Sequence, residues 1–151
     1  MAEGPCTVQD ETTVLQAAKE LKGIPIYLLI NNAGVSTGGE SMSSTSKENM
    51  MREVEIYAVG PLLVTRALLP NVKLAAKSPK KCAHVEQTLT IYASIEGGGG
   101  PFAYCTSKTA LHMVNRNMAS KLKRDNIAMI ILDPGMVYTT MPLRRTHRLC
   151  G

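Results

Sequence analysis

The chain has 151 residues, of which 44% are hydrophobic and 19% are charged, and its formal net charge is +5. This length suits a single domain with a real core, and the composition is typical of a globular protein. The apolar runs fall short of the ~20 residues of a membrane-spanning helix, and the basic residues form no wide stripe with interleaved aromatic residues, so we expect neither a membrane nor a nucleic-acid partner.

The first elements in the chain are a helix and a strand. The segment 10–23 predicts a short helix, with Asp10 placed to cap it and Gly23 to end it. The continuous apolar run over 26–31 predicts a strand that is buried on both faces. A loop over 33–41 follows this strand.

A long helix comes next, through 47–69. Thr45 and Glu48 have the spacing of a capping box at its start. The dipeptide Gly60-Pro61 should kink this helix, and Pro70 should lie at or near its end.

The rest of the chain repeats the alternation of strand and helix. We predict a polar connection over 77–87, a second strand at 88–93, a loop over 94–101, a helix from 102 to about 124 and a third strand at 127–132. The last two strands are also predicted to be buried on both faces. Strands joined by long helices indicate an α/β fold with a parallel sheet.

The last predicted helix places a phenol beside an ammonium group. Tyr104 and Lys108 are four residues apart, so their side chains share one helical face. Such a pair occurs by chance on many solvated helices; alternatively, Lys108 lowers the pKa of Tyr104 so that the phenol can transfer a proton. Ser94 and the segments 31–34 and 134–135 each follow a predicted strand, where ligands of open parallel sheets gather.

The motifs in this order resemble the short-chain dehydrogenase/reductase family. They are NNAG after a buried strand, a serine after the next strand, YCTSK at the start of a helix and DPG after the last strand. The resemblance covers about residues 6 to 141, and within the family the sequence is most similar to the C-factor and Sniffer carbonyl reductase group. It implies an oxidoreductase that transfers hydride between NADP or NAD and a small carbonyl or alcohol substrate, with NADP favoured by the group alone.

The resemblance also implies a role for each matching residue. Tyr104 would be the general acid and base, Lys108 would tune it and hold the nicotinamide ribose, and Ser94 would donate a hydrogen bond to the substrate oxygen. Ser94 could instead only end a strand, and Gly34 could serve only the turn. Further cofactor contacts would come from Asn32, Ala33 and Gly34 on the adenosine side and from Pro134, Gly135, Val137 and Thr139 at the nicotinamide carboxamide.

The sequence departs from the family pattern at several places. We find no glycine-rich phosphate loop after a first strand; the segment 34–40 imitates its opening spacing but has Glu40 where the third glycine should be. Tyr57 stands where the family has a catalytic Asn that holds a water in the proton relay. We therefore expect a chain truncated at both ends, in which residues 1–151 form one incomplete NAD(P)-binding domain.

An incomplete domain has consequences for packing and activity. We expect a partial Rossmann-like sheet that lacks the first two βα units, with three contiguous strands, helices mainly on one face and a bare opposite face. Association is then expected, with a homo-oligomer formed through the helices at 46–70 and 102–124. The enzyme interpretation competes with a non-enzymatic remnant that acts as an interaction or signalling protein, or an incomplete gene product, and we expect weak activity or none from this chain alone.

The cysteines and the N-terminus bear on metal binding and compartment. The four cysteines lie far apart and form no CxxC pair, which favours free thiols over a disulfide framework or a metal site. The N-terminal residues do not have the basic and apolar regions of a secretory signal. A cytoplasmic location is therefore expected. The basic segments 73–81 and 144–148 are interpreted as solvated surface, although a phosphorylated ligand could also use such charge.

Overall fold

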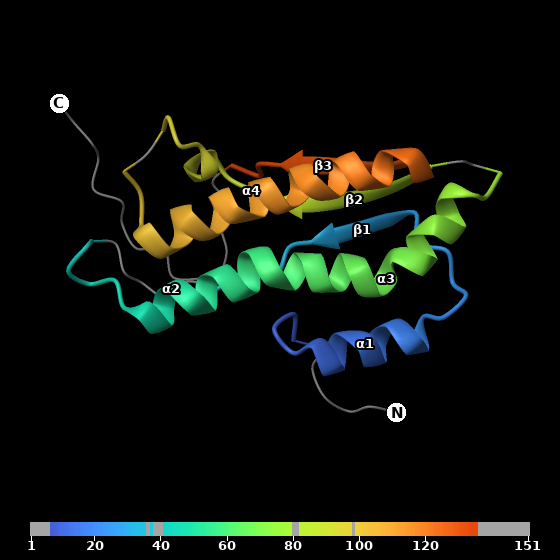
Figure 1. Ribbon diagram of the computed structural model, residues 1–151, viewed down its shortest axis with the longest axis horizontal. Coiled ribbons are helices and arrows are strands. Elements are labelled where there is room, and N and C mark those ends of the chain that lie inside the picture. Colours follow the sequence, from blue (N-terminus) through green and yellow to red (C-terminus); the bar gives the residue numbers. More distant parts are fainter. Residues whose placement is uncertain (1–6, 36, 38–40, 80–81, 98, 136–151) are drawn as a thin grey trace.

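The computed structural model describes residues 7–35, 37, 41–79, 82–97 and 99–135, and the statements below refer to these residues. The strands form one parallel sheet in the order β1-β2-β3, with helices on one of its faces (Figure 1). The strands are β1 (Leu28–Asn31), β2 (Ala83–Thr88) and β3 (Ile127–Leu132). The predicted α/β fold with a three-stranded, Rossmann-like parallel sheet is confirmed.

Two long helical segments connect the neighbouring strands, and right-handed crossovers place both on the same face of the sheet. The first segment consists of α2 (Lys47–Val54), the π-helical turn η1 (Glu55–Val59) and α3 (Gly60–Ala76). The second consists of α4 (Phe102–Leu122) and the 3₁₀ turn η3 (Lys123–Asp125). An N-terminal helix, α1 (Glu11–Glu20), packs against α3.

The hydrophobic core lies between the sheet and the C-terminal parts of α3 and α4. Its buried residues are Val72, Ala75, Ala76, Ala83, Val85, Met118, Leu122 and Ile127. A second, smaller cluster lies beyond the carboxyl end of β2 and is made of Leu89, Ala93 and Leu111. The two clusters hold α4 in its middle, at Leu111, and at its C-terminal end, at Met118 and Leu122.

The opposite face of the sheet carries apolar side chains that no described helix covers. Leu28 and Ile30 of β1 are each 51% exposed, and Ile130 and Leu132 of β3 are 38% and 46% exposed. The register pairs Ile30 with Glu86 and Glu86 with Ile130, so these side chains share one face. The predicted bare face is confirmed for the described residues, and the prediction that the strands are buried on both faces is wrong there.

The second strand lies earlier in the chain than the sequence predicts. It runs from Ala83 to Thr88, whereas the prediction placed a polar connection over 77–87 and a strand at 88–93. Buried and half-exposed residues alternate along β2, as in a strand with one covered face, and this pattern was missed because its outward residues are polar. The segment Ile91–Ala93 forms the 3₁₀ turn η2, and Asp133 accepts a hydrogen bond from the Ile91 N–H at 2.9 Å.

Two predictions about the long helix are also corrected. Ser46, not Thr45, caps α2, because its hydroxyl accepts a hydrogen bond from the Asn49 N–H at 3.1 Å. Pro70 lies inside α3, which continues to Ala76. The helix tolerates this proline because the turn beyond it is packed against the sheet, with Val72 fully buried.

The expected kink at Gly60-Pro61 takes the form of a π-helical turn. Pro61 has no N–H, so the carbonyl group of Tyr57 cannot receive the usual helical hydrogen bond. The Gly60 N–H donates instead to the carbonyl of Glu55, five residues earlier. This wider turn buries three consecutive residues of η1, of which Tyr57 is the central one.

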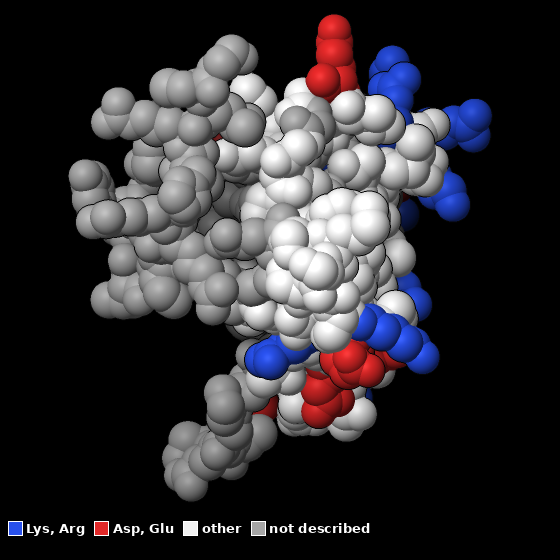
Figure 2. Space-filling model, turned by 90° about the vertical axis from the view of Figure 1, so that its left-hand side faces the viewer, with Lys and Arg blue, Asp and Glu red and all other residues white. Residues whose placement is uncertain are grey.

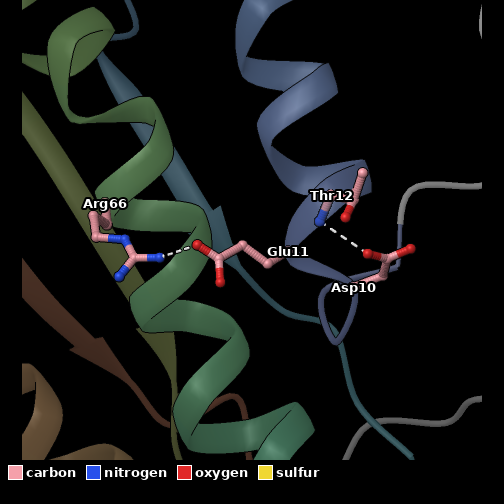
Figure 3. A network of polar contacts seen from close by, with 4 residues as sticks. All are labelled: Asp10, Glu11, Thr12 and Arg66. Atoms are coloured by element: carbon pink, nitrogen blue, oxygen red, sulfur yellow. Dashed lines mark hydrogen bonds and ion pairs between the residues drawn. The ribbon is translucent and has the colours of Figure 1, made fainter.

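Polar contacts attach α1 to α3. Asp10 caps α1, as predicted, by accepting a hydrogen bond from the Thr12 N–H at 2.8 Å. Glu11 forms an ion pair with Arg66 of α3, and both side chains are more than half exposed (Figure 3). Because exposed ion pairs contribute little to stability, the stronger attachment comes from a buried residue, Asn71.

Asn71 fixes the chain that leads from α1 into the sheet. Its side-chain amide donates hydrogen bonds to the carbonyls of Leu21 and Ile24, and its backbone carbonyl accepts one from the Ile26 N–H.

We expect Asn71→Leu to lower the free energy of unfolding by about 2–4 kcal/mol, because two carbonyl groups lose their donor. Urea denaturation would measure this loss; Gln16→Leu, at an exposed position of α1, is the control, and an equal effect of both substitutions would contradict the assignment.

Candidate active site

The residues that the sequence singled out lie at the carboxyl ends of the strands, toward the left of Figure 1. The segment after β1, the turn after β2, the N-terminal half of α4 and the segment after β3 all reach this end. Figure 2 looks onto it, and the described surface near the centre of that view is largely free of charged side chains. Charged groups that form a site at this end are therefore to be sought among the buried residues.

Lys108 is such a group. Its side chain is buried, with only 4% of the residue exposed, and its Nζ donates a hydrogen bond to the backbone carbonyl of Thr88 at 2.7 Å. The same Nζ lies 4.2 Å from the ring centre of Tyr57 and 5.8 Å from that of Tyr104. The ammonium group is therefore stabilised by one carbonyl and by aromatic rings.

Tyr57 connects Lys108 to the segment after β1. Its hydroxyl accepts a hydrogen bond from the Val35 N–H at 2.9 Å and donates one to the Val35 carbonyl. Its ring meets that of Tyr104 edge to face, with the ring centres 5.5 Å apart. A Cβ atom at Gly34 would lie 2.9 Å from the Tyr57 ring and hydroxyl, so Gly34 provides the space for this contact as well as a turn.

Burial shifts the pKa values of these groups. It lowers the pKa of Lys108 to about 8 and raises the pKa of Tyr57 to about 12. The pKa of Tyr104 is also raised by burial, against the opposing effect of a hydrogen bond with the Thr90 side chain. The prediction that Lys108 lowers the pKa of Tyr104 is therefore wrong for this structure, because the ammonium group faces the Thr88 carbonyl and the Tyr57 ring.

Ser94 is the third residue of the predicted catalytic set. It is exposed in the turn after η2, not at the end of a strand, and its hydroxyl accepts a hydrogen bond from the Gly97 N–H at 3.4 Å. It lines an open hollow of about 500 Å³ together with Cys105 and Thr109 of α4. Among the described contacts, no hydrogen bond joins Ser94 to Tyr104 or Lys108.

The predicted cofactor contacts flank the pair at the ends of β1 and β3. Asn32, Ala33 and Gly34 are exposed after β1, and Pro134 and Gly135 are exposed after β3. Gly135 has φ +66, and its N–H donates to the Asp133 carboxylate at 2.9 Å. Val137 and Thr139 lie outside the described residues.

The sequence did not single out Glu53. This residue is only 2% exposed, and its Oε1 accepts hydrogen bonds from both the N–H and the hydroxyl of Thr37. Its Oε2 is buried and has no hydrogen-bond partner in the described part of the chain. A signal was present, because Glu53 precedes Tyr57 by four residues and an acidic side chain there interrupts a buried helical face.

Two further features limit the kind of site. No group of three or more His, Cys, Asp or Glu side chains in the described residues could hold a metal ion. None of the described helices is both long enough and apolar enough to cross a membrane.

Comparison with known proteins places this geometry in a family. The family model for short chain dehydrogenases matches residues 5–148, and the chain belongs to that family. It is 38% identical over 117 residues to the C-signal of Myxococcus xanthus, which covers 78% of this chain and 69% of that protein. It is 29% identical over 135 residues to 1-hydroxy-2-glutathionyl-2-methyl-3-butene dehydrogenase of Rhodococcus sp. (strain AD45), which covers 89% of this chain and 57% of the relative.

Solved structures share the fold. An NADPH-bound carbonyl reductase from chicken fatty liver superimposes with a TM-score of 0.78 at 28% identity, covering 87% of this chain and 56% of the other. The putative carbonyl reductase Sniffer of Caenorhabditis elegans superimposes with a TM-score of 0.79 at 27% identity, covering 89% and 62% of the two chains. The chain thus spans little more than half the length of these reductases.

The contact between Gly34 and Tyr57 gives a first prediction for the site. We expect Gly34→Ala to lower the free energy of unfolding by about 1–3 kcal/mol, because the added Cβ overlaps a ring that Val35 holds in place. Gly97→Ala is the control, since its Cβ would find its nearest neighbour at 3.7 Å. Equal stabilities of the two variants in urea denaturation would show that Tyr57 does not occupy this space.

The lowered pKa of Lys108 gives a second prediction. Between about 8 and the ordinary value of 10.5, the unfolded chain carries the ammonium group while the folded chain carries the neutral amine. The unfolded state then binds more protons, so the stability of the fold rises with pH. We expect the unfolding free energy of the wild type to rise, relative to that of Lys108→Met, by about 2 kcal/mol from about pH 8 to about pH 9.5.

The control for this pH dependence is Lys121→Met, at an exposed position of the same helix. It should retain the pH dependence of the wild type in urea denaturation. A difference between the wild type and Lys108→Met that stays constant over this range would contradict the burial of the ammonium group.

Proposed function

We propose that the chain is a short-chain dehydrogenase/reductase that transfers hydride between NADP(H) or NAD(H) and a small carbonyl or alcohol substrate. The observation that carries this proposal is the buried Lys108 ammonium group beside Tyr104, at the carboxyl end of the sheet in a chain of this family. NADP is favoured because the chicken carbonyl reductase is described as NADPH-bound. Residues 1–151 would act as one domain, in the cytoplasm.

The described residues fit the nicotinamide end of such a cofactor. A charged Lys108 has three N–H donors, of which Thr88 takes one, so donors remain for a ribose hydroxyl. The exposed Asn32, Ala33 and Gly34 would face the adenosine side, and Pro134 and Gly135, with Val137 and Thr139 beyond them, would face the carboxamide. A bound nicotinamide supplies or accepts the hydride.

The proton chemistry falls to the residues of the chain. The raised pKa of Tyr104 keeps its phenol protonated near neutral pH, so Tyr104 can donate a proton to a carbonyl oxygen as the oxygen gains negative charge. Lys108 would take part by holding the nicotinamide ribose, and not by lowering the pKa of Tyr104, which is raised. Ser94, in the turn after η2, would hold the substrate oxygen.

The phosphate groups of the cofactor find a weaker fit. A dinucleotide phosphate usually binds to a glycine-rich turn at the start of a helix, and no such turn follows β1 in the described residues, where the next helix begins at Lys47. We therefore expect the chain alone to bind NADPH and NADH weakly and to turn over slowly. Calorimetric titration tests this, and a dissociation constant in the low micromolar range would contradict it.

The catalytic assignment has a direct test. NADPH oxidation should be followed with a panel of small aldehydes, ketones and quinones, and we expect Tyr104→Phe to lower kcat/KM by about 100-fold or more, because the proton donor is lost. Lys108→Ala should add little to the loss caused by Tyr104→Phe, since groups that act as a unit are not additive.

Tyr92→Phe is the matched control, because the Tyr92 ring lies 6.4 Å from that of Tyr104 but has no proposed part in the chemistry. Full turnover of Tyr104→Phe, or turnover that no substitution of the pair affects, would contradict the catalytic assignment.

A second candidate function is an interaction or signalling protein without turnover. It is favoured by the engagement of Lys108 with Thr88 and Tyr57 and by the similarity to the C-signal of Myxococcus xanthus. In either case the chain would associate with itself through the helices at 46–70 and 102–124, which pack against each other through α2 and α4.

A further inference from the structure

Two buried side chains of the long helix hold the segment that follows Gly34. Tyr57 forms two hydrogen bonds with the backbone of Val35, and Glu53 accepts two from Thr37. Tyr57 is 6% exposed and Glu53 is 2% exposed. The two anchors are one helical turn apart, so they face the same segment.

Packing alone does not account for these residue types. A phenylalanine would fill the space of the Tyr57 ring, but it could not bond both polar groups of the Val35 backbone. A buried carboxylate costs free energy unless it is hydrogen-bonded, so Glu53 contributes through the bonds that Thr37 donates and not through its apolar surface.

The other side of Tyr57 faces Lys108. The Lys108 Nζ is 4.2 Å from the centre of the Tyr57 ring, within the range of a cation–π interaction. The π-helical turn places Tyr57 at the centre of three consecutive buried residues, between this ammonium group and Gly34. The Tyr57 side chain therefore contacts both Lys108 and the residues that follow β1.

We propose that Tyr57, supported by Glu53, is a positioning residue that fixes the Lys108 ammonium group relative to Gly34, Val35 and Thr37. This inference rests on the proposed function, in which Lys108 and the segment after β1 hold two ends of one nucleotide. Where the family resemblance places an asparagine and a water molecule, the hydroxyl of Tyr57 binds the chain directly and its ring supports the ammonium group.

The hydroxyl is tested by amide hydrogen exchange resolved at single residues by NMR. Tyr57→Phe should accelerate the exchange of the Val35 amide by about tenfold, because that N–H loses its acceptor. Glu53→Leu should do the same for the Thr37 amide. The control is Glu55→Gln at an exposed position of the same helix, which should leave both amides unchanged. An unchanged Val35 amide in Tyr57→Phe would overturn the proposal.

The ring is tested by NMR titration of Lys108 in lysine-labelled protein. Tyr57→Phe retains the ring and should retain the titration midpoint of the wild type, whereas Tyr57→Leu should lower it by roughly half a unit or more, because an apolar side chain does not stabilise the cation. Equal midpoints in the two variants would overturn the proposal, as would a higher midpoint in Tyr57→Leu. If Tyr57→Leu does not fold, Tyr57→Phe decides alone. A changed midpoint in Tyr57→Phe would show that the pKa of Lys108 depends on the hydroxyl and not on the ring, and would overturn the proposal.

These measurements do not depend on turnover. If the amide and titration effects appear but no nicotinamide cofactor is oxidised or reduced with any substrate, the positioning holds and the proposed function fails. If turnover depends on Tyr104 but the exchange and titration effects are absent, the function holds and Tyr57 is only a packing residue.

Discussion

The site depends on one electrostatic constraint, which is the burial of the Lys108 ammonium group. A charged group out of water is costly, and among the described residues it contacts one backbone carbonyl and the rings of Tyr57 and Tyr104. These contacts compensate the lost hydration only in part, because the pKa of Lys108 falls to about 8. The ammonium group is thus charged near neutral pH but close to the range in which it can lose its proton.

Several local features provide the contacts that this buried ammonium group needs. Pro61 leaves the Tyr57 carbonyl without its helical donor, and the resulting π-helical turn presents the Tyr57 ring to Lys108. Gly34 has no side chain, which lets the same ring lie against the segment after β1. The end of β2 supplies the Thr88 carbonyl. Tyr57 and Thr88 therefore meet at the Lys108 nitrogen atom, and Gly34 provides the space for the Tyr57 ring.

The sequence predicted the arrangement of the fold better than the details of the site. Parallel strands, long crossovers on one face and the shared face of Tyr104 and Lys108 follow from hydrophobic periodicity and helix geometry, and all are present. The second strand was misplaced because its outward residues are polar and the run at 88–93 is more hydrophobic. The pKa of Tyr104 was predicted in the wrong direction because helical spacing places Lys108 near the ring but does not say which group the ammonium faces. Tyr57 was noticed only as a replacement for asparagine. Its contact with Lys108 depends on the π-helical turn, and Gly60-Pro61 predicted a kink at this place but not its π-helical form.

The most direct test of this account is the titration of Lys108 in the wild-type chain. Lysine-selective NMR spectra recorded across the alkaline range would follow the Cε and Nζ resonances of this residue, with the assignment made by comparison with Lys108→Met. Burial of the ammonium group predicts a midpoint at about 8, well below the ordinary value of 10.5. A midpoint at about 10 or above would show that the ammonium group is solvated and would contradict the arrangement around Tyr57 and Thr88.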